Sequence, residues 1–118
     1  MSAQSFLSRT LSKTRYEASN RRGLSFELTL FDVLHLVDTQ KGKCALTGWT
    51  LEFTRGGNFK GGTNPRGCTI DRLDNAKGYH KDNVQLVCWM ANLIRGSLSL
   101  LEFKELCEAV SSTQNSLQ

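Results

Sequence analysis

One stretch of the chain, from Cys68 to Arg95, contains five polar residues with complementary chemistry: Asp71, Arg72, His80, Asn83 and Asn92. Carboxylate and amide oxygens are ligands for hard divalent cations, a guanidinium can bind a phosphate through two parallel hydrogen bonds, and an imidazole exchanges protons near neutral pH. Side chains of these types could hydrolyse a phosphodiester by orienting a water molecule and stabilising the charge that develops on the phosphate.

The same stretch predicts the elements that would position these side chains. Apolar and polar residues alternate over 69–73, as in a half-buried strand, and alternate again over 84–88. The residues between these two runs include Asn75, Lys77 and Gly78, which are typical of a loop. A helix is expected over 89–95, because the segment contains no breaker and Gly96 follows where a C-cap glycine would stand.

This order of strand, loop, strand and helix resembles the HNH, or ββα-metal, family of nucleases, and is most similar to its small phage and mobile-intron members. The resemblance covers residues 44 to about 110 and rests on Asp71, Arg72, Gly78, Tyr79, Asn83 and Asn92. It implies an α+β fold in which a ββα-metal (HNH, His-Me finger) core is flanked by N-terminal and C-terminal helices. It also implies a metal-dependent DNA endonuclease that hydrolyses phosphodiester bonds by a single-metal mechanism.

The resemblance also implies a role for each side chain. Asp71 and Asn92 would bind the metal ion, which would be Mg²⁺, with Mn²⁺ also acceptable to oxygen ligands. Asn83 would brace the loop. Arg72 stands where the family has its catalytic histidine, but a guanidinium stays protonated and accepts no hydrogen bond, so Arg72 cannot be the base. It could instead clamp a phosphate.

His80 is the best substitute base by residue type, followed by Tyr79 and Asp74. For His80 the alternative is an exposed loop histidine or a phosphate contact. Asp71, Arg72 and Asp74 could also form a solvated strand edge, and Asn83 could be a turn residue. Because the catalytic histidine is missing, the alternative function is a catalytically impaired HNH-fold DNA-binding module. A protein-interaction domain that does not bind nucleic acid is a third class.

The four cysteines raise the question of a structural zinc site. Many HNH proteins carry two C-x-x-C pairs that bind a structural zinc ion. At the spacing of the second cysteine, Cys44 is followed by Thr47 and Cys88 by Ala91, so each pair keeps one member. Since a structural zinc site normally needs four protein ligands, we expect no structural zinc. If the fold is as predicted, Cys44 and Cys88 should still be buried close together.

Positive charge is concentrated in two parts of the chain. Residues 1–23 contain five basic and one acidic residue, and residues 41–81 contain eight basic and three acidic residues. This distribution suits DNA as the partner, because Lys and Arg side chains bind the phosphate backbone. The basic residues expected to contact DNA are Arg15, Arg21, Arg22, Arg55, Lys60, Arg66, Lys77, Lys81 and Arg95.

At 118 residues the chain has the size of one domain. We divide it into a basic N-terminal helical arm (1–23), an HNH-like nuclease domain (24–110) and a flexible tail (111–118). Thr29 with Asp32 and Ser99 with Glu102 have the spacing of capping boxes, which predicts two further helices. The apolar residues expected to line the buried face of the second helix are Leu100, Leu101, Phe103, Leu106, Cys107 and Val110.

The sequence contains no apolar run long enough to span a bilayer, and its first twenty residues are too polar for a secretory signal. We therefore expect no membrane partner and a cytoplasmic, intracellular protein. It could be encoded by a phage and act in the host cell. The oligomeric state and the DNA specificity are left open by the sequence.

Overall fold

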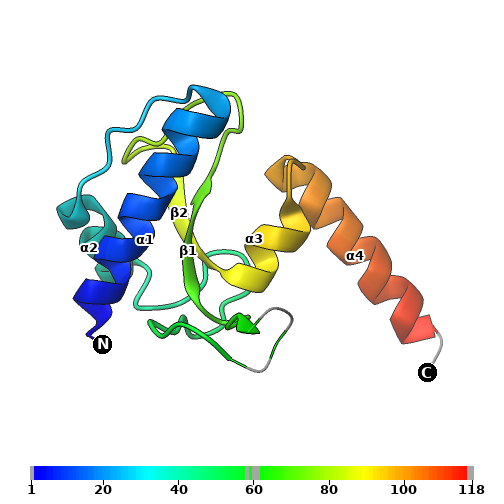
Figure 1. Cartoon of the computed structure of the whole chain (residues 1–118). Coiled ribbons are helices and arrows are strands. Elements are labelled where there is room, and N and C mark those ends of the chain that lie inside the picture. The colour runs from blue at the N-terminus through cyan, green and yellow to red at the C-terminus, as the bar shows by residue number, and fades with distance from the viewer. Residues whose placement is uncertain (1, 58, 60–61, 117–118) are drawn as a thin grey trace.

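The computed structural model describes residues 2–57, 59 and 62–116, except for the side chains of Arg21, Arg22 and Ser116. Its elements in chain order are α1 (Ala3–Glu17), the π-helix η1 (Ala18–Arg22), α2 (Leu30–Thr39), β1 (Cys68–Arg72), β2 (Val84–Cys88), α3 (Trp89–Arg95) and α4 (Leu100–Ser116). Figure 1 shows the small sheet at the centre, with α4 extending away from it. None of the helices among these residues has both the length and the apolar character needed to cross a membrane.

The centre of the fold is the predicted unit of two strands and a helix. β1 and β2 pair in antiparallel register, with Ile70 opposite Leu86 and Asp71 opposite Gln85. Cys88 ends β2 and is also the N-cap of α3, so the helix begins directly from the strand. The predicted α+β class and the order of elements around the site are therefore confirmed.

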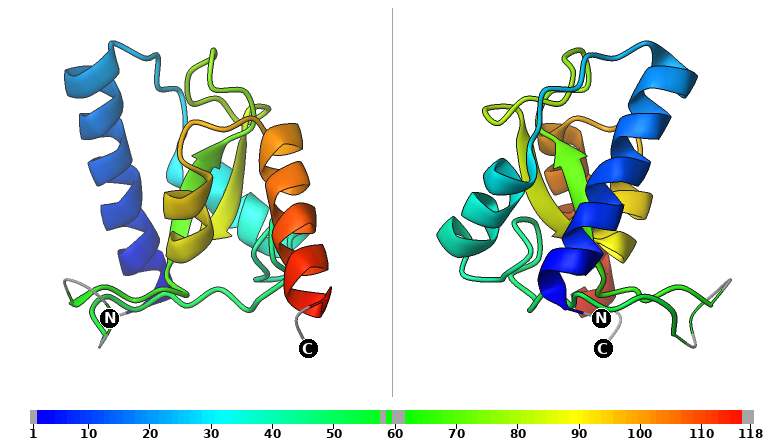
Figure 2. Two further views of the ribbon diagram at one scale, coloured as in Figure 1. Left: turned by 90° about the vertical axis from the view of Figure 1, so that its right-hand side faces the viewer. Right: turned by 60° about the vertical axis from the view of Figure 1, so that its left-hand side comes forward.

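The core is built from both halves of the chain. Val33 of α2 and Leu86 of β2 are completely buried, and Leu7 of α1 is 1% exposed. Figure 2 shows α2 and α3 on opposite faces of the sheet, with α1 along the β1 side. Fully burying one such aliphatic side chain stabilises a fold by about 1.5–3 kcal/mol. The division at residue 23 stays a prediction, but α1 shares its core with the sheet.

The predicted end of the first helical segment and the predicted start of the second helix agree with the structure. α1 and η1 form a continuous helical segment that ends at Gly23, whose φ of 61° lies in the left-handed region that favours glycine. In α2 the capping box is complete, since the Thr29 hydroxyl accepts a hydrogen bond from the backbone of Asp32 and the Asp32 carboxylate accepts one from the backbone of Thr29.

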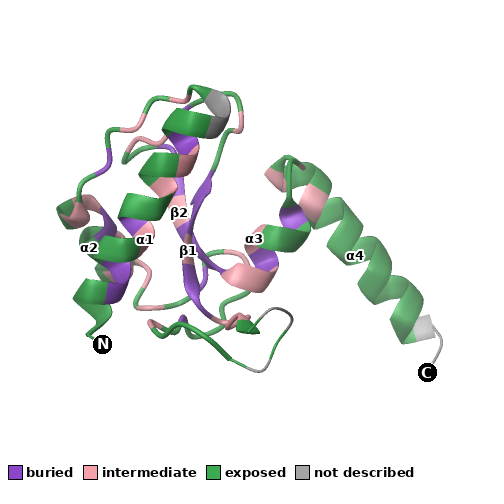
Figure 3. Ribbon diagram, in the orientation of Figure 1, coloured by how far each residue is buried: buried purple, intermediate pink, exposed green. Residues whose placement is uncertain are grey.

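α4 begins where the sequence predicted, but its apolar face is not buried. Glu102 accepts a hydrogen bond from the backbone N–H of Ser99, and this bond lowers the pKa of its carboxyl group. Leu101, Leu106 and Val110 are 67%, 47% and 52% exposed, so the predicted burial of this face is wrong. Figure 3 shows α4 almost entirely exposed. Helical spacing places the apolar residues on one face of α4, but the direction of the chain after α3 decides whether that face packs against the core.

Cys44 and Cys88 lie together in the core, as predicted. The backbone N–H of Cys88 donates to Sγ of Cys44 at 3.3 Å, and the two residues are 0% and 2% exposed respectively. Burial raises the pKa of Cys44, but hydrogen bonds from the Thr47 side chain and from backbone N–H groups outweigh it, so the net shift is downward. Burial raises the pKa of Cys88, and it raises that of Cys68 to about 12.

The burial of these thiols predicts a simple reactivity pattern. Only Cys107 is exposed, so one of the four thiols should react quickly with Ellman's reagent in the native protein at pH 8, and all four should react in guanidinium chloride. Changing Cys107→Ser should remove the fast reaction. Two or more fast thiols in the native protein would contradict the buried positions of Cys44, Cys68 and Cys88.

Candidate active site

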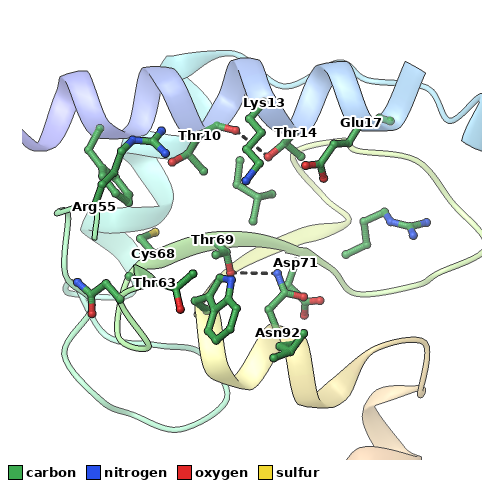
Figure 4. A pocket seen from close by; sticks show the side chains of 18 of the residues that line it. Thr10, Lys13, Thr14, Glu17, Arg55, Thr63, Cys68, Thr69, Asp71 and Asn92 are labelled. Carbon is green, nitrogen blue, oxygen red and sulfur yellow. Dashed lines mark hydrogen bonds between the residues drawn. The ribbon is translucent and has the colours of Figure 1, made fainter. Parts of the chain in front are cut away.

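A groove with a volume of about 910 Å³ runs between α1 and α3, and β1 forms its floor. Figure 4 shows this arrangement, with α1 above the strand and α3 below it. The predicted site residues that line the groove are Asp71, Arg72, Asn92 and Arg55. His80, Asn83 and Arg95 are not among the lining residues. Asn83 is hydrogen-bonded to the loop between the strands, and Arg95 is hydrogen-bonded to Asp71.

Asp71 is held rigidly on the groove floor. Its two carboxylate oxygens each accept a hydrogen bond from Nη1 of Arg95 at 2.6 Å, and Oδ2 also accepts one from the Gln85 side chain at 3.0 Å. Gln85 is the cross-strand partner of Asp71, so the sheet register places this donor directly beside it. A carboxylate has about four acceptor sites, and these three bonds leave room for one further interaction.

Arg95 is a structural residue, and its predicted contact with DNA is wrong. The residue is 1% exposed, and besides Asp71 its guanidinium donates to the backbone carbonyls of Arg72 and Leu98. Its position four residues after the buried Ala91 puts both on the inner face of α3.

Asn92 faces the same groove from α3. Its amide nitrogen donates to Oγ1 of Thr69 at 3.0 Å, and among the described residues no donor is bonded to its Oδ1. Figure 4 shows the side chains of Asp71 and Asn92 next to each other at the groove floor. One carboxylate and one amide oxygen fit an Mg²⁺ ion, which usually takes one or two protein ligands and completes its shell with water and phosphate oxygens.

This pair is a sparse donor set. No three His, Cys, Asp or Glu side chains come together as a metal site anywhere in the described parts of the chain. Most of a bound ion's coordination shell would therefore have to come from water and substrate, which is usual for Mg²⁺ but not for Zn²⁺.

Asn83 spans the loop between the strands. Its amide nitrogen donates to the carbonyls of Gly78 at 2.8 Å and Asp74 at 3.1 Å, and its oxygen accepts from the backbone N–H of Asp74 at 2.9 Å. The side chain is buried, so each bond replaces one that water would make. These are the contacts expected of a loop brace.

Arg72 is divided between the loop and the groove. Its Nη1 donates to the carbonyls of Asn75 at 2.7 Å and Lys77 at 2.9 Å, and its guanidinium lies 5.4 Å from the ring centroid of Tyr79. Among the described residues, no acceptor is bonded to its Nε or Nη2. Arg72 therefore shapes the loop while keeping N–H groups that a phosphate oxygen could use.

His80 lies outside the groove, which does not agree with the predicted role as base. Its Nδ1 is 2.7 Å from Oε2 of Glu27, and its Nε2 is 3.2 Å from Oγ of Ser25. The backbone of Tyr79 also pairs with this segment, because its N–H donates to the carbonyl of Ser25 and its carbonyl accepts from Glu27. His80 thus joins the loop to residues 25–27, a contact that no pattern in the sequence predicted.

The predicted DNA contacts are spread over the surface. Arg55 is exposed and lines the groove, and Lys77 and Lys81 are exposed on the loop that Asn83 braces. Arg15 is exposed beside Phe26, whereas Arg66 is half-buried with its guanidinium 3.7 Å from the ring centroid of Trp49. Lys60 and the side chains of Arg21 and Arg22 lie outside the described residues.

α1 forms one wall of the groove, a position that was not predicted from the sequence. Its lining residues are Phe6, Thr10, Lys13, Thr14 and Glu17. They follow the helical spacing from the buried Phe6, so one face of α1 runs from the core into the groove. The signal was present as this spacing, but the element opposite α1 could not be read from it.

A solved structure is similar to this fold. The chain superposes on PacI, described as a rare-cutting HNH restriction endonuclease, with a TM-score of 0.63 and 23% identity over 93% of this chain and 80% of that one. The fold is similar to an HNH endonuclease fold. No protein-family profile matches the sequence, and no curated protein matches it. The predicted HNH-like core flanked by helices is therefore confirmed at the level of the fold.

The buried pair of Asp71 and Arg95 makes a prediction about stability. Changing Arg95→Met leaves a buried carboxylate without its partner, so the free energy of unfolding should fall by about 3–5 kcal/mol, as measured by urea titration. Changing the exposed Arg9→Met should shift it by less than about 0.5 kcal/mol.

A second substitution tests whether the unpaired charge is the cause. Adding Asp71→Asn to the Arg95→Met variant removes the uncompensated charge and should recover part of the loss. Equal small effects of Arg95→Met and Arg9→Met would show that the ion pair does not stabilise this unit.

Proposed function

We propose that this protein is a metal-dependent DNA endonuclease that hydrolyses phosphodiester bonds with a single metal ion. The observation that carries the proposal is that Asp71 on β1 and Asn92 on α3 face one groove of a ββα unit. The fold supports it, since the similar protein PacI is described as an HNH restriction endonuclease. A DNA substrate also agrees with the cytoplasmic location expected from the sequence.

In this proposal the carboxylate of Asp71 and Oδ1 of Asn92 would hold Mg²⁺, or Mn²⁺ in its place. When bound, the ion supplies Lewis-acid stabilisation of the charge on the phosphate. Arg95 and Gln85 fix the orientation of Asp71 before substrate arrives, so little reorganisation is needed during the reaction.

The remaining residues act on the substrate and on the loop. Arg72 donates its unbonded N–H groups to an oxygen of the phosphate, and Asn83 keeps the loop that carries Lys77 and Lys81 in place. Arg55 lies at the groove and adds positive charge where the DNA backbone would pass. Binding through such contacts weakens as the salt concentration rises.

A DNA-binding module without cleavage activity is the second candidate. It is favoured by the absence of an imidazole among the described residues that line the groove. It is also favoured by the two loop carbonyls that Arg72 binds, which give this residue a purely structural use.

A nicking assay separates these functions. The protein should convert supercoiled plasmid to the nicked form in the presence of Mg²⁺ or Mn²⁺, and Asp71→Asn should slow this at least about 100-fold by removing the ligand charge. Gel-shift binding of DNA should remain, and Asp38→Asn on α2 is the matched surface control.

Tight, salt-sensitive DNA binding without nicking in either ion would leave the binding module as the function. If the protein does not bind DNA at any salt concentration, both candidates fail and a protein-interaction domain is indicated.

A further inference from the structure

The proposed reaction still needs a group that removes the proton from the attacking water. Arg72 cannot accept a proton, and His80 lies outside the groove with both ring nitrogens engaged. Asp71 is occupied by Arg95 and Gln85. Tyr79 also lines the groove, but its ring packs against the Arg72 guanidinium, and a neutral phenol is a weaker base than a carboxylate. The base is therefore sought on the facing wall of the groove.

Glu17 on α1 is a proton acceptor on the opposite wall. It is half-buried and lines the groove, and its carboxylate makes no hydrogen bond or ion pair with any group that the structure describes. Figure 4 shows its carboxylate extending from α1 toward β1, on the side of the groove opposite Asn92. A carboxylate that no described residue engages can accept a hydrogen bond from a water molecule in the groove.

The other polar residues of this wall are poor bases. Lys13 carries an ammonium group, which donates but does not accept hydrogen bonds. Thr14 donates its hydroxyl to the carbonyl of Thr10 at 2.7 Å, so it is engaged within the helix. Neither type of side chain accepts a proton readily at neutral pH.

The position of Glu17 is fixed by the residues around it. The next residue, Ala18, is 3% exposed, and the earlier turns of α1 are anchored in the core by Phe6, Leu7 and Leu11. The guanidinium of Arg15 lies 5.1 Å from the ring centroid of Phe26, which fastens the same turn to the segment after Gly23. Glu17 is thus held at a defined height above the groove floor.

We propose that Glu17 is the general base of the reaction, an inference that rests on the proposed endonuclease function. Its carboxylate takes the proton of a water molecule in the groove while the water oxygen forms a bond to phosphorus. The bond from phosphorus to the leaving sugar oxygen breaks, and that oxygen takes a proton from solvent water. Glu17 then releases its proton to solvent, which restores the starting state.

The first test replaces the carboxylate with a neutral group of the same shape. Glu17→Gln should slow single-turnover nicking about 100-fold or more, with DNA affinity and the Mg²⁺ concentration for half-maximal rate unchanged. Asp38→Asn, which removes one negative charge from the exposed side of α2, should leave the nicking rate unchanged.

The second test supplies the base from solution. Added formate or acetate should restore part of the nicking rate of Glu17→Ala, and acetate, the stronger base, should restore more. The ionic strength must be held constant with chloride, because salt weakens phosphate contacts. Neither anion should rescue Asp71→Asn, in which the base is still present.

Several outcomes would overturn this role while leaving the proposed function in place. Glu17→Gln could nick as fast as Asp38→Asn while Asp71→Asn is inactive, which would show that Glu17 is not needed. A raised Mg²⁺ requirement or lost DNA affinity in Glu17→Gln would assign it to metal or DNA binding instead. By contrast, a wild-type protein that does not nick DNA would remove the proposed function itself, and the role of Glu17 with it.

Discussion

The ion pair between Asp71 and Arg95 is the interaction on which the ββα unit depends. Burying a charge is costly unless a partner and further hydrogen bonds compensate it, and here one guanidinium binds both oxygens of one carboxylate. Arg95 also donates to the carbonyl of Arg72 at the end of β1 and to that of Leu98 after α3. The contact that joins the strand to the helix is therefore the same contact that orients the carboxylate at the groove floor.

The long loop between the strands is kept in place by side chains rather than by regular structure. Asn83 and Arg72 donate to its carbonyls from within, and His80 binds Ser25 and Glu27 from outside. Arg72 and His80, which the sequence suggested for phosphate binding and for catalysis, thus also hold the loop in its conformation.

The groove combines parts of the chain that are far apart in sequence. β1 and α3 supply the oxygen-bearing floor, and α1 supplies the facing wall with Lys13 and Glu17. The first helix is consequently more than a basic arm, because its apolar residues enter the core and its polar face completes the groove. The likeness to PacI extends over 93% of the chain, so the flanking helices belong to the shared architecture as well as the ββα centre.

The sequence by itself determined the local elements and the residues at their ends. Alternation, a breaker-free segment and two capping boxes located the strands, α3 and the starts of α2 and α4, because these signals act over a few residues. Only the tertiary structure decided that Arg95 is buried, that His80 binds Ser25, and that α4 is exposed. Asp71 and Arg95 are 24 positions apart, and Ser25 and His80 are 55 apart. Such pairings depend on how whole elements pack, and no local pattern records that.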